Sequence, residues 1–279
     1  MSKYKILDLF CGAGGCSMGY KLAGLEPSGV DINEQPQYPF RFVRGNALEL
    51  VCEMSSRFDA IHASPPCQCF TKYRNCRKDI SSRYEDLIMA TRECLVASGK
   101  PWIMENVVGS PLLAPVTLCG SMFGLDVRRH RLFESSFPIR AKKCDHSVWQ
   151  PNRFPGGRSR ERGHARVLCR GTIEVGRWNI PLSIQQAGMG IDWITDLRML
   201  SEAIPPAFTK YIGEELIAFL NMEAEPTSHN SRVTQGANAH IAEAARRNTA
   251  NVAEAMAEQW GAHILCAKKP AQGTVDDTK

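Results

Sequence analysis

The sequence predicts an α/β protein built on a mostly parallel β-sheet. Through the first 120 residues, short apolar runs alternate with runs of helical periodicity, which is the pattern of βαβ units. A glycine-rich loop follows the first apolar run, and polar residues stand at the ends of later ones. Because the carboxyl ends of parallel strands meet at one edge of a sheet, these polar residues are expected to lie close together there.

The first half of the chain contains the sheet. Strands are expected over residues 4–10, 26–33, 57–64 and 100–108, where apolar and β-branched residues are concentrated. A helix over 16–24 ends in Gly24, and a second over 82–98 ends before Gly99, each glycine being a typical helix terminator. Residues 128–134 ("RRHRLFE") are expected to be extended.

The composition and the periodicity of the sequence change after residue 139. Residues 140–178 lose the alternation and become rich in arginine and glycine, with ten lysines and arginines against three acidic residues, so they form an insertion or a small subdomain. Residues 205–220 return to helical periodicity, with one apolar stripe formed by Phe208, Tyr211, Ile212, Leu216, Phe219 and Leu220. We expect a polar linker over 222–236, an alanine-rich helix over 237–266 and a disordered tail over 267–279.

Length and composition limit the number of domains, the class of partner and the cellular compartment. A chain of 279 residues is long enough for a substantial core in one or two domains, and its net charge of +5 permits a nucleic-acid partner without requiring one. The eleven cysteines are odd in number and form no framework, and the charged first residues do not resemble a secretory leader. No apolar run approaches the ~18 residues of a membrane span. We therefore expect a cytoplasmic protein with free thiols and no membrane partner.

The first chemical motif is "DLFCGAGG" (8–15), which lies between a strand and a helix. Such a loop lets a ligand approach the backbone closely. The third glycine of a dinucleotide loop is replaced by Ser17, and no Gly-Lys-Ser/Thr follows, which argues against a nucleoside triphosphate. Asp31 ends the next strand, where a carboxylate can bind ribose hydroxyls. A plain glycine turn beside a surface aspartate is the alternative.

The second motif is "SPPC" (64–67), in which two prolines stop a strand and hold Cys67 on a stiff backbone. The thiol is either a nucleophile or a small packed side chain. Cys67, Cys69 and Cys76 have no partner pair of the spacing that zinc sites use, so the sequence predicts no metal site. A zinc-bound interaction protein stays open as an alternative, on the cysteine count alone.

Two further motifs end or form strands of the same sheet. "MENVVG" (104–109) places Glu105 and Asn106 at the end of an apolar strand, where polar groups are either structural or part of a site. "RRHR" (128–131) places Arg129 and Arg131 on the same face of an extended segment. A solvated charged strand would explain the second motif equally well.

In this order, "DLFCGAGG", "SPPCQ", "ENV", "RRHR" and "LSEAIPPAFTKYIG" resemble the DNA (cytosine-5) methyltransferase family, over roughly residues 4–221. The resemblance implies a Rossmann-like, S-adenosylmethionine-dependent methyltransferase sheet as a catalytic domain formed by residues 1–139 and 179–221. Residues 140–178 would be a short target-recognition insertion. The helical C-terminal tail is expected from the alanine-rich sequence itself and lies beyond the resemblance.

The resemblance also implies roles for individual residues. Cys67 matches the nucleophile that adds to C6 of cytosine, Glu105 the carboxyl group at N3 and the exocyclic amine, and Arg131 the arginine at O2. Substrate-binding roles fall to Asn106, Arg129 and Gln68. The expected binding residues for the cofactor S-adenosyl-L-methionine are Asp8, Phe10, Gly12, Gly14, Asp31 and Asn46.

Several positions depart from the family pattern. Asn46 stands where an aspartate usually holds the adenine amine, and Val127 replaces a glutamine before the paired arginines. Double-stranded DNA is the expected partner, since its target base must be flipped out of the stack, and the arginine-rich insertion could contact phosphates. A monomer is expected, and a restriction endonuclease partner stays open. So do two other functions, tRNA cytosine-5 methylation and an inactive DNA-binding homologue.

Overall fold

The computed structural model describes residues 3–68, 70, 86–140, 143–147 and 173–224. Cys69, Cys76, most of the insertion predicted over 140–178, the helix predicted over 237–266 and the tail over 267–279 lie outside the described residues. Among the residues that the structure describes, every helix is too short or too polar to cross a lipid bilayer.

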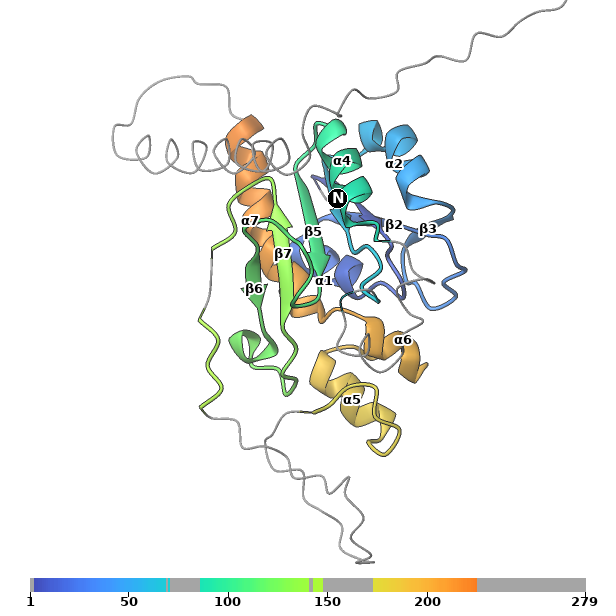
Figure 1. Ribbon diagram of the computed structural model, residues 1–279, viewed down its shortest axis with the longest axis vertical. Coiled ribbons are helices and arrows are strands. Elements are labelled where there is room, and N and C mark those ends of the chain that lie inside the picture. Colours follow the sequence, from blue (N-terminus) through green and yellow to red (C-terminus); the bar gives the residue numbers. More distant parts are fainter. Residues whose placement is uncertain (1–2, 69, 71–85, 141–142, 148–172, 225–279) are drawn as a thin grey trace, which may run out of the picture.

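Within the part of the chain that the structure describes, the centre is a seven-stranded sheet of order β3-β2-β1-β4-β5-β7-β6 (Figure 1). Strands β1 to β5 run parallel to their neighbours, and β7 is antiparallel to both β5 and β6. In chain order, the strands are β1 (Lys5–Leu9), β2 (Glu26–Asp31), β3 (Arg41–Arg44), β4 (Ala60–Ala63), β5 (Trp102–Asn106), β6 (Val116–Leu118) and β7 (Arg131–Ser135). The mostly parallel α/β sheet predicted from the sequence is confirmed.

Helices cover both faces of the sheet. Alternate residues of β1 point to opposite faces, so Ile6 joins one apolar cluster while Leu7 and Leu9 join another. The first cluster packs against α1 (Gly15–Ala23) and α7 (Pro206–Ala224), and the second against α2 (Ala47–Met54) and α4 (Ile88–Ala97). The result is a layer of helices on each side of a buried sheet, as expected for a parallel sheet.

Small residues let α7 pack closely against α1, although the two helices are far apart in the sequence. A Cβ atom on Gly19 would lie only 2.0 Å from Oγ1 of Thr209. The Thr209 hydroxyl also donates a hydrogen bond of 2.9 Å to the carbonyl oxygen of Cys16. This contact joins the last described helix, α7, to the first helix, α1.

A third apolar cluster lies beside the glycine loop. Helices α5 (Leu182–Met189) and α6 (Leu197–Glu202) lie together at one end of the molecule (Figure 1) and contribute Met189 and Leu200 to it. Val127 is buried in the same cluster, so an apolar residue suits this position. Trp193 donates a hydrogen bond of 2.9 Å from Nε1 to the carbonyl oxygen of Ala13, which connects this cluster to the loop.

The predicted elements are found with modest differences at their ends. The strands expected over 26–33 and 57–64 end earlier, at Asp31 and Ala63, and the helix expected over 82–98 begins at Ile88 among the described residues. Helix α7 continues to Ala224, so the start of the linker predicted at residue 222 is wrong. The sequence analysis assigned no bounds to β3, β6, α2, α5, α6 or the short 3-10 turns η1 (Ser55–Arg57) and η3 (Gly120–Phe123).

Candidate active site at the carboxyl edge of the sheet

The predicted site residues of the sheet come together at one edge. The glycine loop, Asp31, Cys67 and Glu105 follow or end the parallel strands β1, β2, β4 and β5. Strand β7 is antiparallel, so its first residue, Arg131, lies at the same edge as the last residues of β5. The reversal of this one strand brings the arginine to the carboxyl ends of the others.

Glu105 and Arg131 form an ion pair at this edge. Nε of Arg131 lies 3.2 Å from Oε1 of Glu105, whose residue is only 5% exposed. Burial raises the pKa of the Glu105 carboxyl, and the positive charges of Arg131 and Arg129 oppose this rise. The site therefore favours a protonated carboxyl group more than water does.

Cys67 is half-buried at the end of the Pro65-Pro66 segment. Burial raises the pKa of its thiol, and so does the negative charge of Glu105, whereas Arg131 and Arg129 lower it. Cys67, Glu105 and the two arginines thus influence one another electrostatically. Such mutual perturbation of titratable groups is common at functional sites.

Asn106 connects β5 to the loop that carries Cys67. Its Nδ2 donates a hydrogen bond of 2.9 Å to the carbonyl oxygen of Pro65, and its Oδ1 accepts one of 2.9 Å from the backbone N–H of Val107. The residue is buried, so both ends of its amide are satisfied within the protein. Gln68, the other residue predicted to contact the substrate beside Cys67, is half-buried.

Arg129 extends from the segment before β7 to helix α6. Its guanidinium donates a hydrogen bond of 2.6 Å to the carbonyl oxygen of Ser201, while its Nε has no hydrogen-bond partner among the described residues. Burial, together with the charge of Arg131, lowers the pKa of Arg129 to about 9. A partly buried guanidinium with a spare N–H can donate a hydrogen bond to a further ligand oxygen.

The glycine loop adopts backbone conformations that favour glycine. Gly12 and Gly14 have φ angles of +48° and +87°, and Phe10 has the unusual value of 58° for a residue with a side chain. The backbone N–H of Gly12 donates a hydrogen bond of 3.1 Å to Oδ2 of Asp31. A Cβ atom on Gly12 would meet nothing within 4 Å, so open space lies over the loop.

Asp8 lies beneath this loop, at 1% exposure. Its Oδ2 accepts a hydrogen bond of 2.5 Å from the Ser17 hydroxyl, which also lies 2.6 Å from the hydroxyl of Tyr38. Its Oδ1 has no hydrogen-bond partner among the described residues. Burial raises the pKa of the Asp8 carboxyl to about 7.

Asn46 forms the N-cap of α2. Its Oδ1 accepts a hydrogen bond of 3.0 Å from the backbone N–H of Leu48, and its Nδ2 donates one of 2.9 Å to Glu49. This is the usual role of asparagine at a helix start. Its predicted contact with the cofactor's adenine stays a prediction.

The sequence analysis missed the residues that support the site from distant parts of the chain. Trp193 and Ser201 hold the glycine loop and Arg129 through the hydrogen bonds described above. Tyr38 contributes its hydroxyl to the Asp8–Ser17 network. These side chains belong to no local motif, so their positions follow only from the packing.

Comparison with known proteins shows a similarity over the first part of the chain. Residues 4–110, which include the glycine loop, Cys67, Glu105 and Asn106, match the family of C-5 cytosine-specific DNA methylases. The match covers 107 of the 279 residues, so this part of the chain is similar to that family. Arg129 and Arg131 lie beyond the matched residues.

Two relatives illustrate the extent of the similarity. The Type II methyltransferase M.AgeI of Thalassovita gelatinovora is 28% identical over 121 residues, which are 38% of this chain and only 28% of that relative. A solved structure of a candidate DNA modification methyltransferase encoded within a prophage (E. coli) matches 78% of this chain and 100% of that chain, with a TM-score of 0.50 and 16% identity. At that identity, the second similarity concerns the fold alone.

Proposed function

We propose that this protein is a DNA (cytosine-5) methyltransferase that acts on double-stranded DNA. The observation that carries the proposal is the placement of Cys67 and Glu105 at the ends of the neighbouring strands β4 and β5, with Arg131 paired to Glu105. The match of residues 4–110 to the C-5 cytosine-specific DNA methylases supports cytosine methylation as the reaction of this arrangement.

The reaction requires a nucleophile and an acid that act on the same cytosine ring. C5 of cytosine is a weak nucleophile, and addition of the Cys67 thiolate to C6 pushes an electron pair toward C5. The Glu105 carboxyl group can donate its proton to N3 as the electrons shift, and Arg131 can hold O2. After the methyl group has been added, Glu105 takes back the N3 proton. Loss of the C5 proton to water then re-forms the C5–C6 double bond and expels Cys67 as a thiolate.

The electrostatics of the site suit these roles. The raised pKa of Glu105 favours the protonated form that N3 needs. The raised pKa of Cys67 favours the thiol in the free protein, so the two arginines, which lower it, assist formation of the thiolate. Asn106 supports the proposal as a positioning residue, since its hydrogen bond to Pro65 fixes the loop before Cys67.

The residues around the glycine loop fit S-adenosyl-L-methionine, which supplies the methyl group when bound. The space over Gly12 admits a ligand next to the backbone, and a side chain at this position would occupy that space. Asp31 is half-exposed beside it and can accept hydrogen bonds from ribose hydroxyls. We assign Phe10, Gly12, Gly14 and Asp31 to this site, with Asp8 supporting the loop from below.

The DNA partner is proposed from the family and from charge. A cytosine in a duplex cannot present C6 to a thiol, so the base must leave the stack. The basic residues of 140–178 can contact phosphates, and we propose this segment as the target-recognition region. Because M.AgeI is named as a Type II methyltransferase, a restriction endonuclease of the same specificity is the proposed functional partner.

Bisulfite sequencing of DNA from bacteria that express the protein tests the function. Methylcytosine is expected within one short sequence, and it should disappear with Cys67→Ser. Cys94→Ser is the matched control, because Cys94 is also half-buried but lies on α4. Methylation that persists in Cys67→Ser would contradict the mechanism.

A trapping experiment tests the covalent step separately. Duplex DNA with 5-fluorocytosine at the target should form a stable adduct with the wild-type protein and the methyl donor, because the fluorine at C5 cannot leave as the proton does. Peptide mapping should locate the adduct at Cys67. Methyl transfer to tRNA but not to duplex DNA would replace the DNA substrate by RNA.

A further inference from the structure

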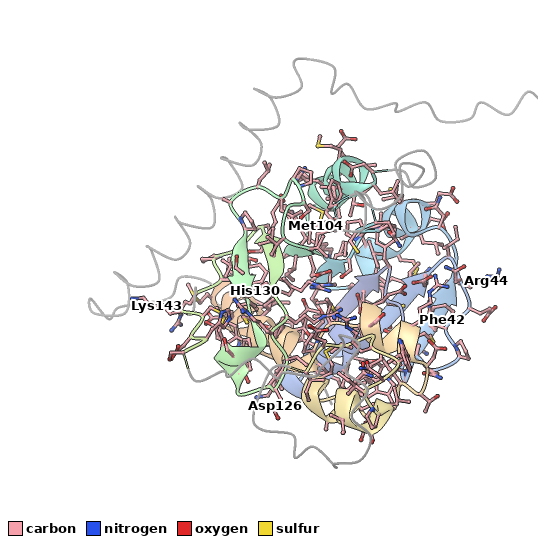
Figure 2. All side chains as sticks on the ribbon, turned by 60° about the horizontal axis from the view of Figure 1, so that its bottom comes forward. Phe42, Arg44, Met104, Asp126, His130 and Lys143 are labelled. Carbon is pink, nitrogen blue, oxygen red and sulfur yellow. The ribbon has the colours of Figure 1, made fainter. Side chains whose placement is uncertain are left out.

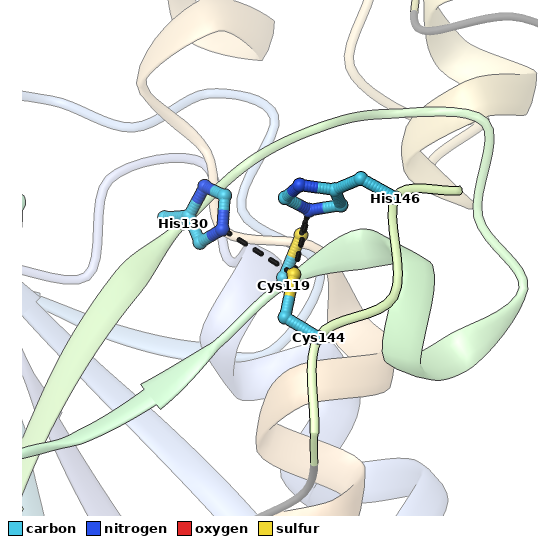
Figure 3. Close-up of side chains that lie close together, drawn as sticks. All are labelled: Cys119, His130, Cys144 and His146. Carbon is cyan, nitrogen blue, oxygen red and sulfur yellow. Dashed lines mark hydrogen bonds between the residues drawn. The ribbon is translucent and has the colours of Figure 1, made fainter. Parts of the chain in front are cut away.

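Four side chains that the proposed reaction does not use converge beside strands β6 and β7. They are Cys119, His130, Cys144 and His146 (Figure 3). Each offers one sulfur or ring nitrogen, and these four atoms all lie within 4.8 Å of one another. Cysteine and histidine are the usual ligands of structural zinc in proteins.

The fold builds the first half of this cluster from a strand pair. In the antiparallel pair of β6 and β7, Leu118 lies opposite Arg131. Continuing that register by one residue places Cys119, the residue after β6, opposite His130, the residue before β7. Cys119 is fully buried there. Two potential ligands therefore face each other across the end of a rigid strand pair.

The second half comes from a separate segment, residues 143–147. Cys144 and His146 alternate with Asp145, so both can point toward the strand pair while Asp145 points elsewhere. Figure 2 shows His130 and Lys143 on the same side of the molecule, opposite Phe42 and Arg44 of the far edge strand β3. The cluster thus joins a loop to the sheet at the edge formed by β6.

The distances approach those of a tetrahedral zinc site. Zn–S and Zn–N bonds of about 2.3 and 2.0–2.1 Å put a sulfur and a nitrogen about 3.5 Å apart. Sγ of Cys119 lies 3.4 Å from Nε2 of His146, and Sγ of Cys144 lies 3.4 Å from Nε2 of His130. The Cys144–His146 distance of 2.6 Å is shorter, and an ion between the two would move the exposed Cys144 outward by about 1 Å.

The orientation of the four side chains also fits a tetrahedral zinc site. Both histidines turn Nε2 toward the sulfurs, and their rings are nearly perpendicular at 79°, so they do not stack on each other. Two thiolates and two neutral imidazoles would also balance the charge of a divalent ion. A thiol needs only one partner to form a hydrogen bond, whereas here four ligand atoms from three segments of the chain converge.

We propose that Cys119, His130, Cys144 and His146 bind one zinc ion. Tetrahedral sites with two sulfurs and two nitrogens are typical of zinc. Four protein ligands fill its coordination shell and leave no position for a reacting water, so the ion is structural. Its role is to hold residues 143–147 against the β6–β7 pair.

This position gives the ion a second consequence, which rests on the proposed function. Residues 143–147 lie at the start of the proposed target-recognition region, and His130 stands between Arg129 and Arg131 in the sequence. Zinc would therefore fix both the entry to the region that reads DNA and the backbone that carries the two arginines of the active site.

The sequence analysis predicted no metal site because it considered only Cys67, Cys69 and Cys76. The new cluster has no closely spaced cysteine pair, and Cys119 meets His130 only through strand pairing. The short Cys144-Asp145-His146 sequence is the one local signal that pointed to it.

Metal analysis of the purified full-length protein tests the proposal. We expect about one zinc per chain in wild-type protein prepared without chelator, and a loss of most of it in Cys119→Ser and Cys144→Ser. Cys52→Ser is the matched control for Cys144, since both side chains are exposed, and it should retain the metal. Asp145→Asn, which changes the residue between two ligands, should retain it as well.

Cobalt substitution provides a readout that does not depend on methyltransferase activity. Cobalt(II) added to metal-free wild-type protein should give thiolate-to-metal charge transfer in the near ultraviolet and intense visible bands of tetrahedral geometry. Circular dichroism identifies any variant that fails to fold. If the variant of the buried Cys119 does not fold, the cobalt spectrum of the folded Cys144→Ser or His146→Ala protein replaces it as the test.

Three results would overturn the proposal. The first is a wild-type protein that contains no zinc and does not give the cobalt spectrum. The second is full zinc stoichiometry in both Cys119→Ser and Cys144→Ser. The third is loss of zinc in Cys67→Ser. The last result would assign the metal to the cysteines around residue 67. Zinc retained in a Cys67→Ser protein without methyltransferase activity separates this proposal from the proposed function.

Discussion

The side-chain amide of Asn106 donates a hydrogen bond of 2.9 Å to the carbonyl oxygen of Pro65, and so ties the end of β5 to the segment that carries Cys67. Two strand ends that belong to different parts of the sequence are thereby held in one fixed relationship. The position of Cys67 relative to Glu105 depends on this bond, because Glu105 precedes Asn106 on the same strand.

Asn106→Asp tests this positioning role. A carboxylate can still accept the hydrogen bond from Val107, but it cannot donate to Pro65, whose carbonyl oxygen loses its partner. We expect a loss of about 1–3 kcal/mol in the free energy of unfolding, measured by urea denaturation. Adduct formation with 5-fluorocytosine DNA should slow by a larger factor than stability alone explains, because the thiol is no longer held in place. An unchanged trapping rate in the folded variant would contradict the role of Asn106.

Glu105→Gln tests the charge coupling at the active site. Removing the carboxylate takes away a negative charge that raises the pKa of Cys67, and it frees Arg131, which lowers it. The pKa of the thiol should therefore fall, and iodoacetamide should modify Cys67 faster at neutral pH. Mass spectrometry of the modified peptides measures this rate, with the exposed Cys52 as the internal reference. The same variant should lose about 10²–10⁴-fold in methyl transfer if Glu105 is the acid. Slower alkylation of Cys67 would refute the coupling.

Asp8 should give the stability a pH dependence that Asp8→Asn removes. Burial raises the pKa of this carboxyl from 3.8 to about 7 in the folded protein, so the folded state holds the proton more tightly than the unfolded chain. Its contribution is complete below about pH 4, falls as the pH rises to about 7 and is constant above, a total change of roughly 4 kcal/mol.

Thermal unfolding at a series of pH values measures this effect. The difference in Tm between Asp8→Asn and the wild type should shift in favour of the variant between pH 4 and 7. Asp192→Asn, at an exposed position, should follow the wild type at every pH. A difference between Asp8→Asn and the wild type that does not vary with pH would count against the raised pKa.

The ion pair between Arg92 and Glu134 is the main buried pair of charges among the described residues, and Arg92→Met tests its contribution. Both side chains are 1% exposed, and two hydrogen bonds of 2.8 Å join them across α4 and β7. Methionine leaves the Glu134 carboxylate buried without its partner, which should destabilise the protein by about 3–5 kcal/mol. Arg198→Met disrupts the exposed pair with Glu202 and should change the unfolding free energy by less than about 1 kcal/mol. Similar losses in the two variants would show that burial of the pair is unimportant.

Much of the fold could be predicted from the sequence because it depends on local patterns. The strands that contain Ile6, Ile61 and Ile103 are apolar runs, and their ends are marked by the glycine loop, by Pro65-Pro66 and by Glu105. The direction of parallel strands then placed Cys67 and Glu105 at one edge. The motifs along residues 4–110 also resemble those of the C-5 cytosine-specific DNA methylases.

Only the tertiary structure decided which distant residues meet. The antiparallel direction of β7 brings Arg131 to Glu105 and Cys119 to His130, and the packing of α7 on α1 depends on the absence of a side chain at Gly19. No local preference specifies these contacts, because they depend on the order of strands and on how closely surfaces fit. The sequence by itself determined the elements and the chemical groups at their ends. The tertiary structure determined their partners, since a contact between residues far apart in the chain is fixed by the packing of the whole domain.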